Sequence, residues 1–187
     1  MQPDRVFITG DLIDFAKISQ AQLAPLAQLN APVDFCIGNH ERYVDLEDIC
    51  ARLSALGINV LRNASHSVTI QGTRVQILGI DDADRRDQVS REIVKLTPEP
   101  NSYRILLYHR PDDAEAAASW GAHLMLCGHT HNGQIVPFNF LVRRVFPRIR
   151  GSYPISDMTL YVSTGTGTWG PVLRLGSRGE ITHLRLV

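Results

Sequence analysis

Apolar residues occur in short runs along the whole chain, and the spacing inside each run separates predicted strands from predicted helices. Apolar residues at helical spacing predict helices at residues 21–28, 46–56, 88–96 and 112–120. The turn Gln71-Gly72-Thr73 lies between two alternating runs and predicts a hairpin. Continuous or alternating β-rich runs predict strands at residues 6–8, 33–37, 58–61, 66–70, 74–80, 104–108, 123–127, 133–136, 159–163 and 181–187.

This alternation of strands and helices is typical of layered α/β folds. We expect two mixed β-sheets packed face to face as a sandwich, with helices on both outer sides in four α/β/β/α layers. The chain has 187 residues, of which 44% are apolar, so it can bury one sizeable core. No linker-like stretch divides it, and we expect one domain over residues 1–187.

Charge and cysteine content narrow the range of functions. Lys plus Arg and Asp plus Glu number 19 each, so the net field does not attract nucleic acid or acidic lipid to the chain as a whole. Cys36, Cys50 and Cys127 are odd in number and lie mostly within apolar runs, which favours reduced thiols. The sequence has no signal-peptide pattern and no run of about 20 apolar residues that could span a bilayer. We therefore expect a soluble, cytoplasmic protein.

Side chains that can bind metal ions follow four of the predicted strands. A Gly-Asp turn or a strand-terminal histidine is usually an ordinary turn or a solvated residue when it occurs alone. Several such motifs in one chain instead favour a shared site for two metal ions. The motifs are Gly10-Asp11, Gly38-Asn39-His40-Glu41, His109 after residues 104–108, and Gly128-His129-Thr130-His131.

The residue types indicate what such a site can do. Asp11 can bridge two divalent ions, which together stabilise the attacking and leaving oxygens of a phosphoryl transfer. His129 and His131 lie two positions apart, so in extended backbone their imidazoles point to the same side. Asn39 adds a carbonyl oxygen and His109 a third imidazole, a mixed set that suits Mn, Fe or Zn.

His40 is predicted to act on the substrate. It lies beside Asn39, so its imidazole can stay off the metal and protonate the leaving group, a task that suits a side chain titrating near neutrality. Glu41 is expected to orient either that imidazole or a metal ligand. The predicted catalytic residues are His40, Asp11 and Asn39.

At these motifs the sequence resembles the calcineurin-like metallophosphoesterase family, and the resemblance covers nearly the whole chain. It implies hydrolysis of a phosphodiester or phosphomonoester by a metal-bridging hydroxide, with His40 as proton donor or phosphate contact. It also implies that Asp11 bridges both metals, that His131 binds the first, and that the remaining ligands bind the second. The residues that match the family's ligands are Asp11, Asn39, His109, His129 and His131.

One family motif is absent from the sequence. The family opens with a strand ending in Asp-x-His, which gives two ligands to the first metal, and no such pair precedes Asp11 here. We therefore expect an N-terminally truncated domain that lacks its first strand, with Asp11 and His131 as the only protein ligands of the first metal. The expected cofactors are two divalent ions (Mn, Fe or Zn) in the intact family site, and one in this chain.

A basic stretch follows the last motif. No Asp or Glu occurs from residue 116 to residue 156. Its arginines could bind the substrate or anionic lipid headgroups, or form a solvated face over a local apolar cluster. With residues 133–135 and 161–171, the stretch resembles the membrane-associated bacterial branch of the family, which includes hydrolases of lipid-linked or nucleotide-linked phosphodiesters. The predicted substrate-binding residues are Arg143, Arg144, Arg148 and Arg150.

Three functions follow from these observations. The first is a metal-dependent phosphoesterase that acts on a phosphoester, with a lipid- or nucleotide-linked compound as the expected substrate. The second is a catalytically impaired binding module of the same fold that keeps one metal site. The third, a nuclease, is disfavoured because the chain lacks a broad basic excess. We expect an anionic lipid or membrane surface as the partner, a peripheral position on that membrane, and no obligate protein partner.

Overall fold

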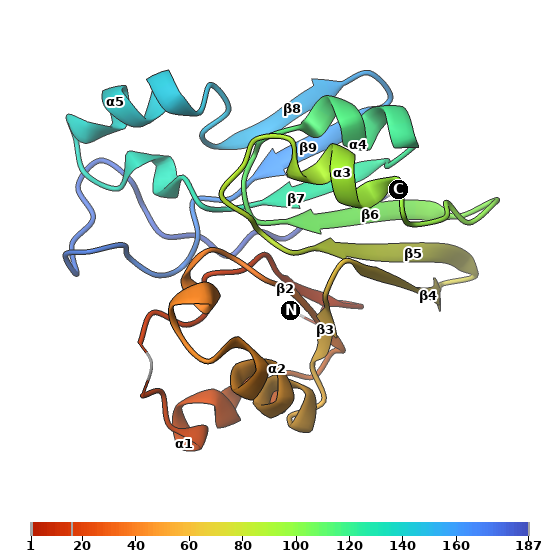
Figure 1. The fold of residues 1–187 in the computed structure, drawn as a ribbon, viewed down its shortest axis with the longest axis horizontal. Coiled ribbons are helices and arrows are strands. Elements are labelled where there is room, and N and C mark those ends of the chain that lie inside the picture. Colours follow the sequence, from red (N-terminus) through yellow and green to blue (C-terminus); the bar gives the residue numbers. More distant parts are fainter. Residues whose placement is uncertain (1, 16, 187) are drawn as a thin grey trace.

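Two β-sheets flanked by helices make up the structure, a computed structural model that describes residues 2–15 and 17–186 (Figure 1). The smaller sheet is parallel and has the order β1-β2-β3. Its strands are β1 (Val6–Ile8), β2 (Val33–Cys36) and β3 (Asn59–Leu61). The segments that cover its outer side are α1 (Gln20–Leu23), the 3-10 helix η1 (Ala24–Gln28) and α2 (Leu46–Ala55).

The larger sheet has six strands in the order β4-β5-β6-β7-β9-β8. Its centre is parallel, and antiparallel hairpins form both ends. The strands are β4 (Ala64–Ile70), β5 (Thr73–Ile80), β6 (Tyr103–Tyr108), β7 (Leu124–Cys127), β8 (Gly151–Ile155) and β9 (Met158–Val162). The remaining helices are α3 (Gln88–Ile93), α4 (Ala114–Trp120), α5 (Phe138–Val145) and the short 3-10 helices η2 (His40–Tyr43) and η3 (His131–Gly133).

The central strands bury both faces, which explains their nearly continuous apolar sequences. One set of alternate residues packs beneath α3 and α4, and includes Leu78, Ile80, Leu106 and Tyr108. The opposite set packs against Cys36 and Leu61 of the smaller sheet, and includes Val75, Ile77, Ile105 and Leu107. The predicted four-layer α/β/β/α architecture is thereby confirmed.

Four elements differ from the predictions. Residues 133–136 were predicted as a strand, but Gly133 and Gln134 have φ of 72° and 53°, and only Ile135 forms isolated bridges. Residues 181–186 form no strand, and the side chain of Ile181 is exposed. Strand β8 was missed because it contains Pro154, which an edge strand tolerates. Helix α5 was missed although Phe138, Leu141, Val142 and Val145 lie at helical spacing, because this stretch was interpreted as a basic, apolar loop.

None of the helices in the described part of the chain is both long and apolar enough to cross a bilayer.

Candidate metal centre

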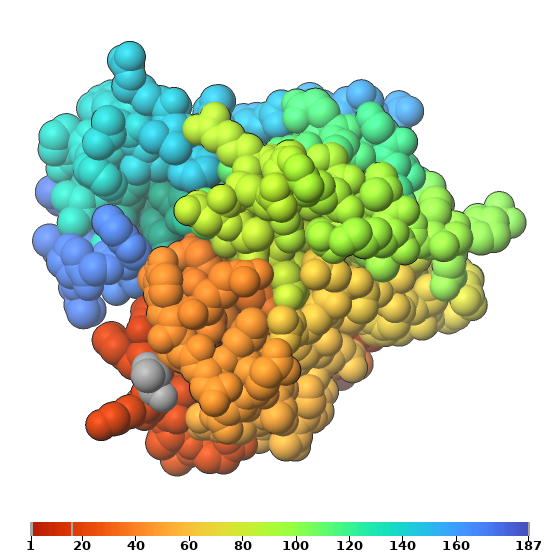
Figure 2. Space-filling view, viewed as in Figure 1, coloured from red at the N-terminus to blue at the C-terminus, as the bar shows by residue number. Residues whose placement is uncertain are grey.

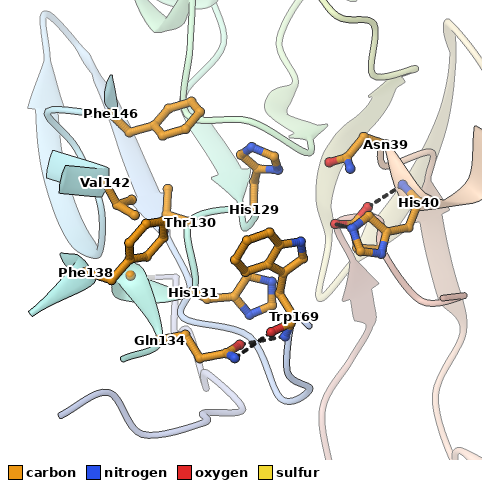
Figure 3. Close-up of a pocket in the computed structure, with 12 residues that line it drawn as sticks. Asn39, His40, His129, Thr130, His131, Gln134, Phe138, Val142, Phe146 and Trp169 are labelled. Carbon is orange, nitrogen blue, oxygen red and sulfur yellow. Dashed lines mark hydrogen bonds and ion pairs between the residues drawn. The ribbon is translucent and has the colours of Figure 1, made fainter. Parts of the chain in front are cut away.

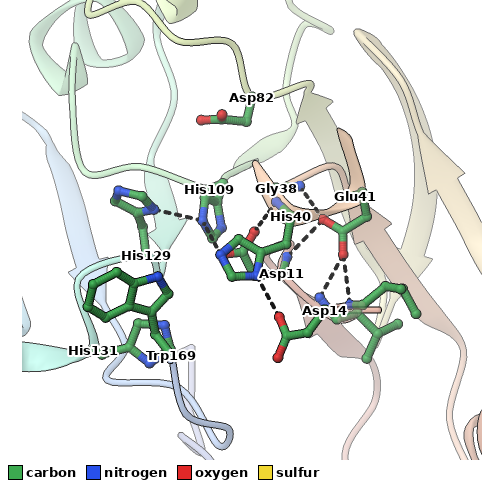
Figure 4. Close-up of polar contacts among 12 residues, drawn as sticks. Asp11, Asp14, Gly38, His40, Glu41, Asp82, His109, His129, His131 and Trp169 are labelled. Atoms are coloured by element: carbon green, nitrogen blue, oxygen red, sulfur yellow. Dashed lines mark hydrogen bonds and ion pairs between the residues drawn. The ribbon is translucent and has the colours of Figure 1, made fainter. Parts of the chain in front are cut away.

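The predicted metal ligands meet where strands of both sheets end. Asp11 follows β1 and Asn39 follows β2, whereas His109 directly follows β6 and His129 follows β7 (Figures 3 and 4). Parallel neighbouring strands bring their carboxyl ends to one edge, so each sheet contributes its ligands side by side. The site therefore lies between the two sheets.

Glycines allow the two loops of the smaller sheet to touch. Gly10 has φ of 84°, and a Cβ atom on it would lie 2.5 Å from the Cα of Gly38. A Cβ atom on Gly38 would lie 2.3 Å from Asp11 Oδ1. Both distances are far below van der Waals contact, so the Gly-Asp and Gly-Asn motifs require their glycines. Asp11 and His129 themselves have φ of 54° and 67°, an uncommon conformation that clusters at functional sites.

Three ligand atoms converge on one point. His109 Nε2 lies 3.0 Å from Asp11 Oδ2 and 3.0 Å from His129 Nδ1. The other ring nitrogen of His109, Nδ1, donates to the Thr9 carbonyl at 2.8 Å, which leaves Nε2 facing the centre. Asn39 Oδ1 is buried and has no hydrogen-bond partner among residues 2–15 and 17–186. A carboxylate, two imidazoles and an amide oxygen form a donor set that suits a divalent metal ion.

The electrostatics favour the metal-binding forms of Asp11 and His129 at neutral pH. Burial raises the pKa of Asp11, but hydrogen bonds and charge from His109 and His40 outweigh it and leave the pKa at about 2. Burial and the charge of His109 lower the pKa of His129 to about 3. Burial lowers the pKa of His109, but its hydrogen bond to Asp11 raises it more. An ionised Asp11 and a neutral His129 are the protonation states that bind divalent cations.

Glu41 holds the loop that carries Asp11. Its side chain is fully buried, at 0% exposure, and its carboxylate accepts four backbone N–H groups. Oε2 accepts from Asp11 at 2.9 Å and Gly38 at 2.8 Å, and Oε1 accepts from Leu12 at 2.7 Å and Ile13 at 3.1 Å. Of the two roles predicted for Glu41, the contacts fit the orientation of a metal ligand and not that of the His40 imidazole, because each hydrogen bond of the carboxylate goes to backbone. Glu41 thus positions the candidate ligand Asp11 (Figure 4).

Asp14, which the sequence analysis missed, orients His40. Its Oδ1 lies 2.5 Å from His40 Nδ1, while His40 Nε2 points towards the metal ligands at 3.7 Å from Asp11 Oδ2 (Figure 4). The backbone N–H of His40 donates to Asp11 Oδ1 at 2.9 Å. The sequence offered one sign of this role: Asp14 lies three residues after Asp11, in the same loop.

Comparison with known proteins identifies the family. A family model described as calcineurin-like phosphoesterase matches residues 1–133. The chain belongs to the calcineurin-like phosphoesterase family. It is 33% identical to the phosphodiesterase YaeI of Escherichia coli, over 100% of this chain and 71% of that protein. It is 34% identical to a transmembrane protein with metallophosphoesterase domain from Bos taurus, over 100% of this chain and 46% of that protein.

One further relative in sequence and one solved structure are similar to the chain. An uncharacterized metallophosphoesterase of Helicobacter pylori is 36% identical over 98% of this chain and 51% of its own length. The chain thus spans about half the length of the bovine and Helicobacter relatives. The crystal structure of phosphopantetheinyl hydrolase PptH from Mycobacterium tuberculosis aligns with a TM-score of 0.54 and 13% identity, covering 86% of this chain and 78% of that one. At this identity, the likeness shows the shared fold alone.

His131 lies in a different environment from the other predicted metal ligands. Its Nδ1 lies 3.2 Å from Arg174 Nη2, and its backbone carbonyl accepts from Ser177 Oγ at 2.7 Å. Burial and the charge of Arg174 lower its pKa to about 4. The cluster of mutually close ligand atoms comprises Asp11, His109 and His129, without His131. Arg174 was missed because nothing near it in the sequence resembles a ligand motif.

A pocket of about 200 Å³ opens in front of the metal ligands (Figure 3). Asp11, Asn39 and the histidines form one side, and apolar side chains from α5 and the C-terminal segment form the other. The apolar side consists of Phe138, Val142, Phe146 and Trp169. The four arginines predicted to bind substrate do not line this pocket: Arg143, Arg144 and Arg150 are exposed, and Arg148 forms an ion pair with Glu115.

Proposed function

We propose that this domain is a metal-dependent phosphoesterase. The observation that supports the proposal best is the convergence of Asp11, His109 and His129 beside the unpaired, buried oxygen of Asn39. A buried polar atom without a partner is costly unless a ligand satisfies it, and the neighbouring donors favour a divalent cation. When bound, such cations activate water for attack on phosphorus and neutralise charge on the phosphoryl oxygens.

The residues around the ligands would guide the proton and the substrate. His40 would donate a proton from Nε2 to the leaving oxygen, because Asp14 accepts from Nδ1 and thereby keeps the ring oriented. Glu41 would keep Asp11 in place throughout the reaction.

We further propose that Asp11, Asn39, His109 and His129 hold the more tightly bound metal ion. Asp11 and His131 would hold a second ion, and Mn, Fe and Zn suit both sites. The alternative is an impaired module with one metal, and the observation that favours it is the contact between His131 and Arg174. A guanidinium at 3.2 Å from His131 repels a cation that binds there.

The substrate that we propose is a lipid-linked or nucleotide-linked phosphoester, hydrolysed at a membrane surface by a domain on its cytoplasmic side. The apolar wall formed by Phe138, Val142, Phe146 and Trp169 faces the metal ligands, so a substituent next to the scissile phosphate would pack on it. An apolar wall of this kind favours the lipid-linked class. It can also stack a nucleobase, since Phe138 and Trp169 are aromatic.

The test combines metal content with turnover on one sample. The protein is loaded with Mn or Zn, bound metal per chain is measured, and hydrolysis of bis-p-nitrophenyl phosphate is followed. Two ions with turnover support the binuclear enzyme, whereas one ion without turnover supports the impaired module. His129→Ala should lower metal content and His183→Ala, an exposed control outside the site, should not. Unchanged metal content in His129→Ala would refute the ligand assignment.

A further inference from the structure

Two segments beside the pocket expose large apolar side chains. Helix α5 exposes Phe140 and Leu141 at 64% and 55% of their surfaces. The segment of residues 169–176 exposes Val172 at 93% and Leu173 at 56%. We define the apolar rim as the large apolar residues that these two segments expose. They are Phe138, Phe140, Leu141, Val145, Trp169, Val172, Leu173 and Leu175.

The two segments are joined through defined contacts. The rings of Phe138 and Trp169 are stacked with centroids 6.3 Å apart. Gln134 accepts from the Trp169 backbone N–H and donates to the Trp169 carbonyl, each at 2.6 Å. The backbone N–H of Val136 donates to the carbonyl of Leu175 at 2.9 Å. Figure 2 shows the two segments at one end of the molecule, α5 in cyan and residues 169–176 in blue.

Basic side chains border the apolar rim along α5, whereas Asp84 and Asp112 lie with three arginines around a neighbouring cavity that Val145 also lines. Arg143 and Arg144 are exposed on α5, and Arg150 is exposed just after it. No acidic residue occurs from residue 116 to residue 156. Exposed apolar groups combined with basic residues are typical of protein surfaces that insert into the interface of an anionic bilayer. Isolated exposed apolar residues occur on every protein, but a contiguous group with a basic border indicates an interaction surface.

We propose that the apolar rim docks onto an anionic membrane, with the arginines of α5 contacting lipid phosphates. The same charges disfavour a second copy of the chain as the occupant, because a two-fold interface through this face would bring the arginines of both copies together. Phe138 and Trp169 belong both to the apolar rim and to the pocket wall, so docking would bring the pocket mouth to the lipid headgroups. The proposal extends the proposed function, but binding can be measured without turnover.

The experiment measures co-sedimentation with vesicles of phosphatidylcholine, with and without phosphatidylglycerol. The protein should bind only the vesicles that contain phosphatidylglycerol, and added NaCl should weaken that binding. Leu141→Glu and Val172→Glu should each reduce binding about tenfold, because each places a carboxylate where an apolar side chain inserts. Val94→Glu is the matched control, since Val94 is 71% exposed at the C-cap of α3 and does not belong to the apolar rim.

The outcomes separate docking from catalysis. Leu141 and Val172 do not line the pocket, so both variants should hydrolyse bis-p-nitrophenyl phosphate at the wild-type rate. Absent binding, or equal binding to both kinds of vesicle, would overturn the docking proposal. Self-association that Val172→Glu abolishes, without vesicle binding, would show a second copy as the occupant. Vesicle binding without any turnover would leave docking intact and refute the proposed function.

Discussion

Replacing Glu41 with Gln tests whether this buried carboxylate holds the metal-binding loop. Gln keeps one oxygen, so two of the four backbone N–H donors would face an amide NH₂ group instead of an acceptor. A hydrogen bond to a charged group contributes about 1.5–3 kcal/mol, and two such bonds therefore about 3–6 kcal/mol. Burial raises the pKa of Glu41, which shows that desolvation of the charge offsets part of this gain. We expect the free energy of unfolding to fall by about 2–4 kcal/mol.

The assay is urea denaturation of the metal-free protein, read as the change in midpoint at constant slope. Glu47→Gln is the matched control: Glu47 forms a surface ion pair with Arg62 and its side chain is 82% exposed, so the change should be below about 1 kcal/mol. Metal affinity should also fall in Glu41→Gln, by about 10–100-fold, because the backbone of Asp11 loses its anchor. A Glu41→Gln variant with wild-type stability and wild-type metal affinity would refute the reasoning.

Three further predictions concern single side chains of the site. Gly38→Ala should abolish metal binding measured by titration, because the added methyl group would overlap Asp11; wild-type affinity would contradict the close approach. Asp11 has a pKa of about 2 against an ordinary value of 3.8, so it stabilises the metal-free fold above about pH 4, and about 2 kcal/mol should be lost as the pH falls towards 2. Asp11→Asn should remove this part of the acid dependence of unfolding. Arg174→Met should raise the pKa of His131 in an NMR titration of the metal-free protein, and a pKa that stays near 4 would show that burial alone sets it.

The spacing of apolar residues predicted those helices and strands whose apolar side chains are buried in the core. Residues 46–56 were predicted as a helix, and α2 has Asp45 as N-cap and its apolar side turned to the core. The alternating residues 64–80 form the predicted hairpin. Helix α5 also has apolar residues at helical spacing, but it is only eight residues long and buries none of them completely, so its sequence resembles that of an exposed basic loop.

The ligand motifs were predictable because their backbone conformation limits their composition. Gly10 and Gly38 must lack a Cβ atom where the loops touch, so the motifs stand out in the sequence. The residues that support the ligands have no such restriction. Asp14 and Arg174 act through side chains that could have reached the site from many positions, and only the folded chain shows that they contact His40 and His131. The candidate ligands can therefore be recognised from a motif, whereas their supporting contacts require the structure.

The position of the site between the two sheets links metal binding to the stability of the fold. Asp11 and Asn39 belong to loops of the smaller sheet, whereas His109 and His129 follow strands of the larger one. In the metal-free protein, the ion pair between Asp11 and His109 at 3.0 Å and the hydrogen bond from His109 Nδ1 to the Thr9 carbonyl at 2.8 Å join the two sheets at this edge. A bound cation would replace the ion pair with bonds to all four side chains. Binding to the folded state alone adds about 2.7 kcal/mol at a free metal concentration 100 times the dissociation constant. The same four side chains would therefore bind the catalytic ion and stabilise the packing of the two sheets against each other.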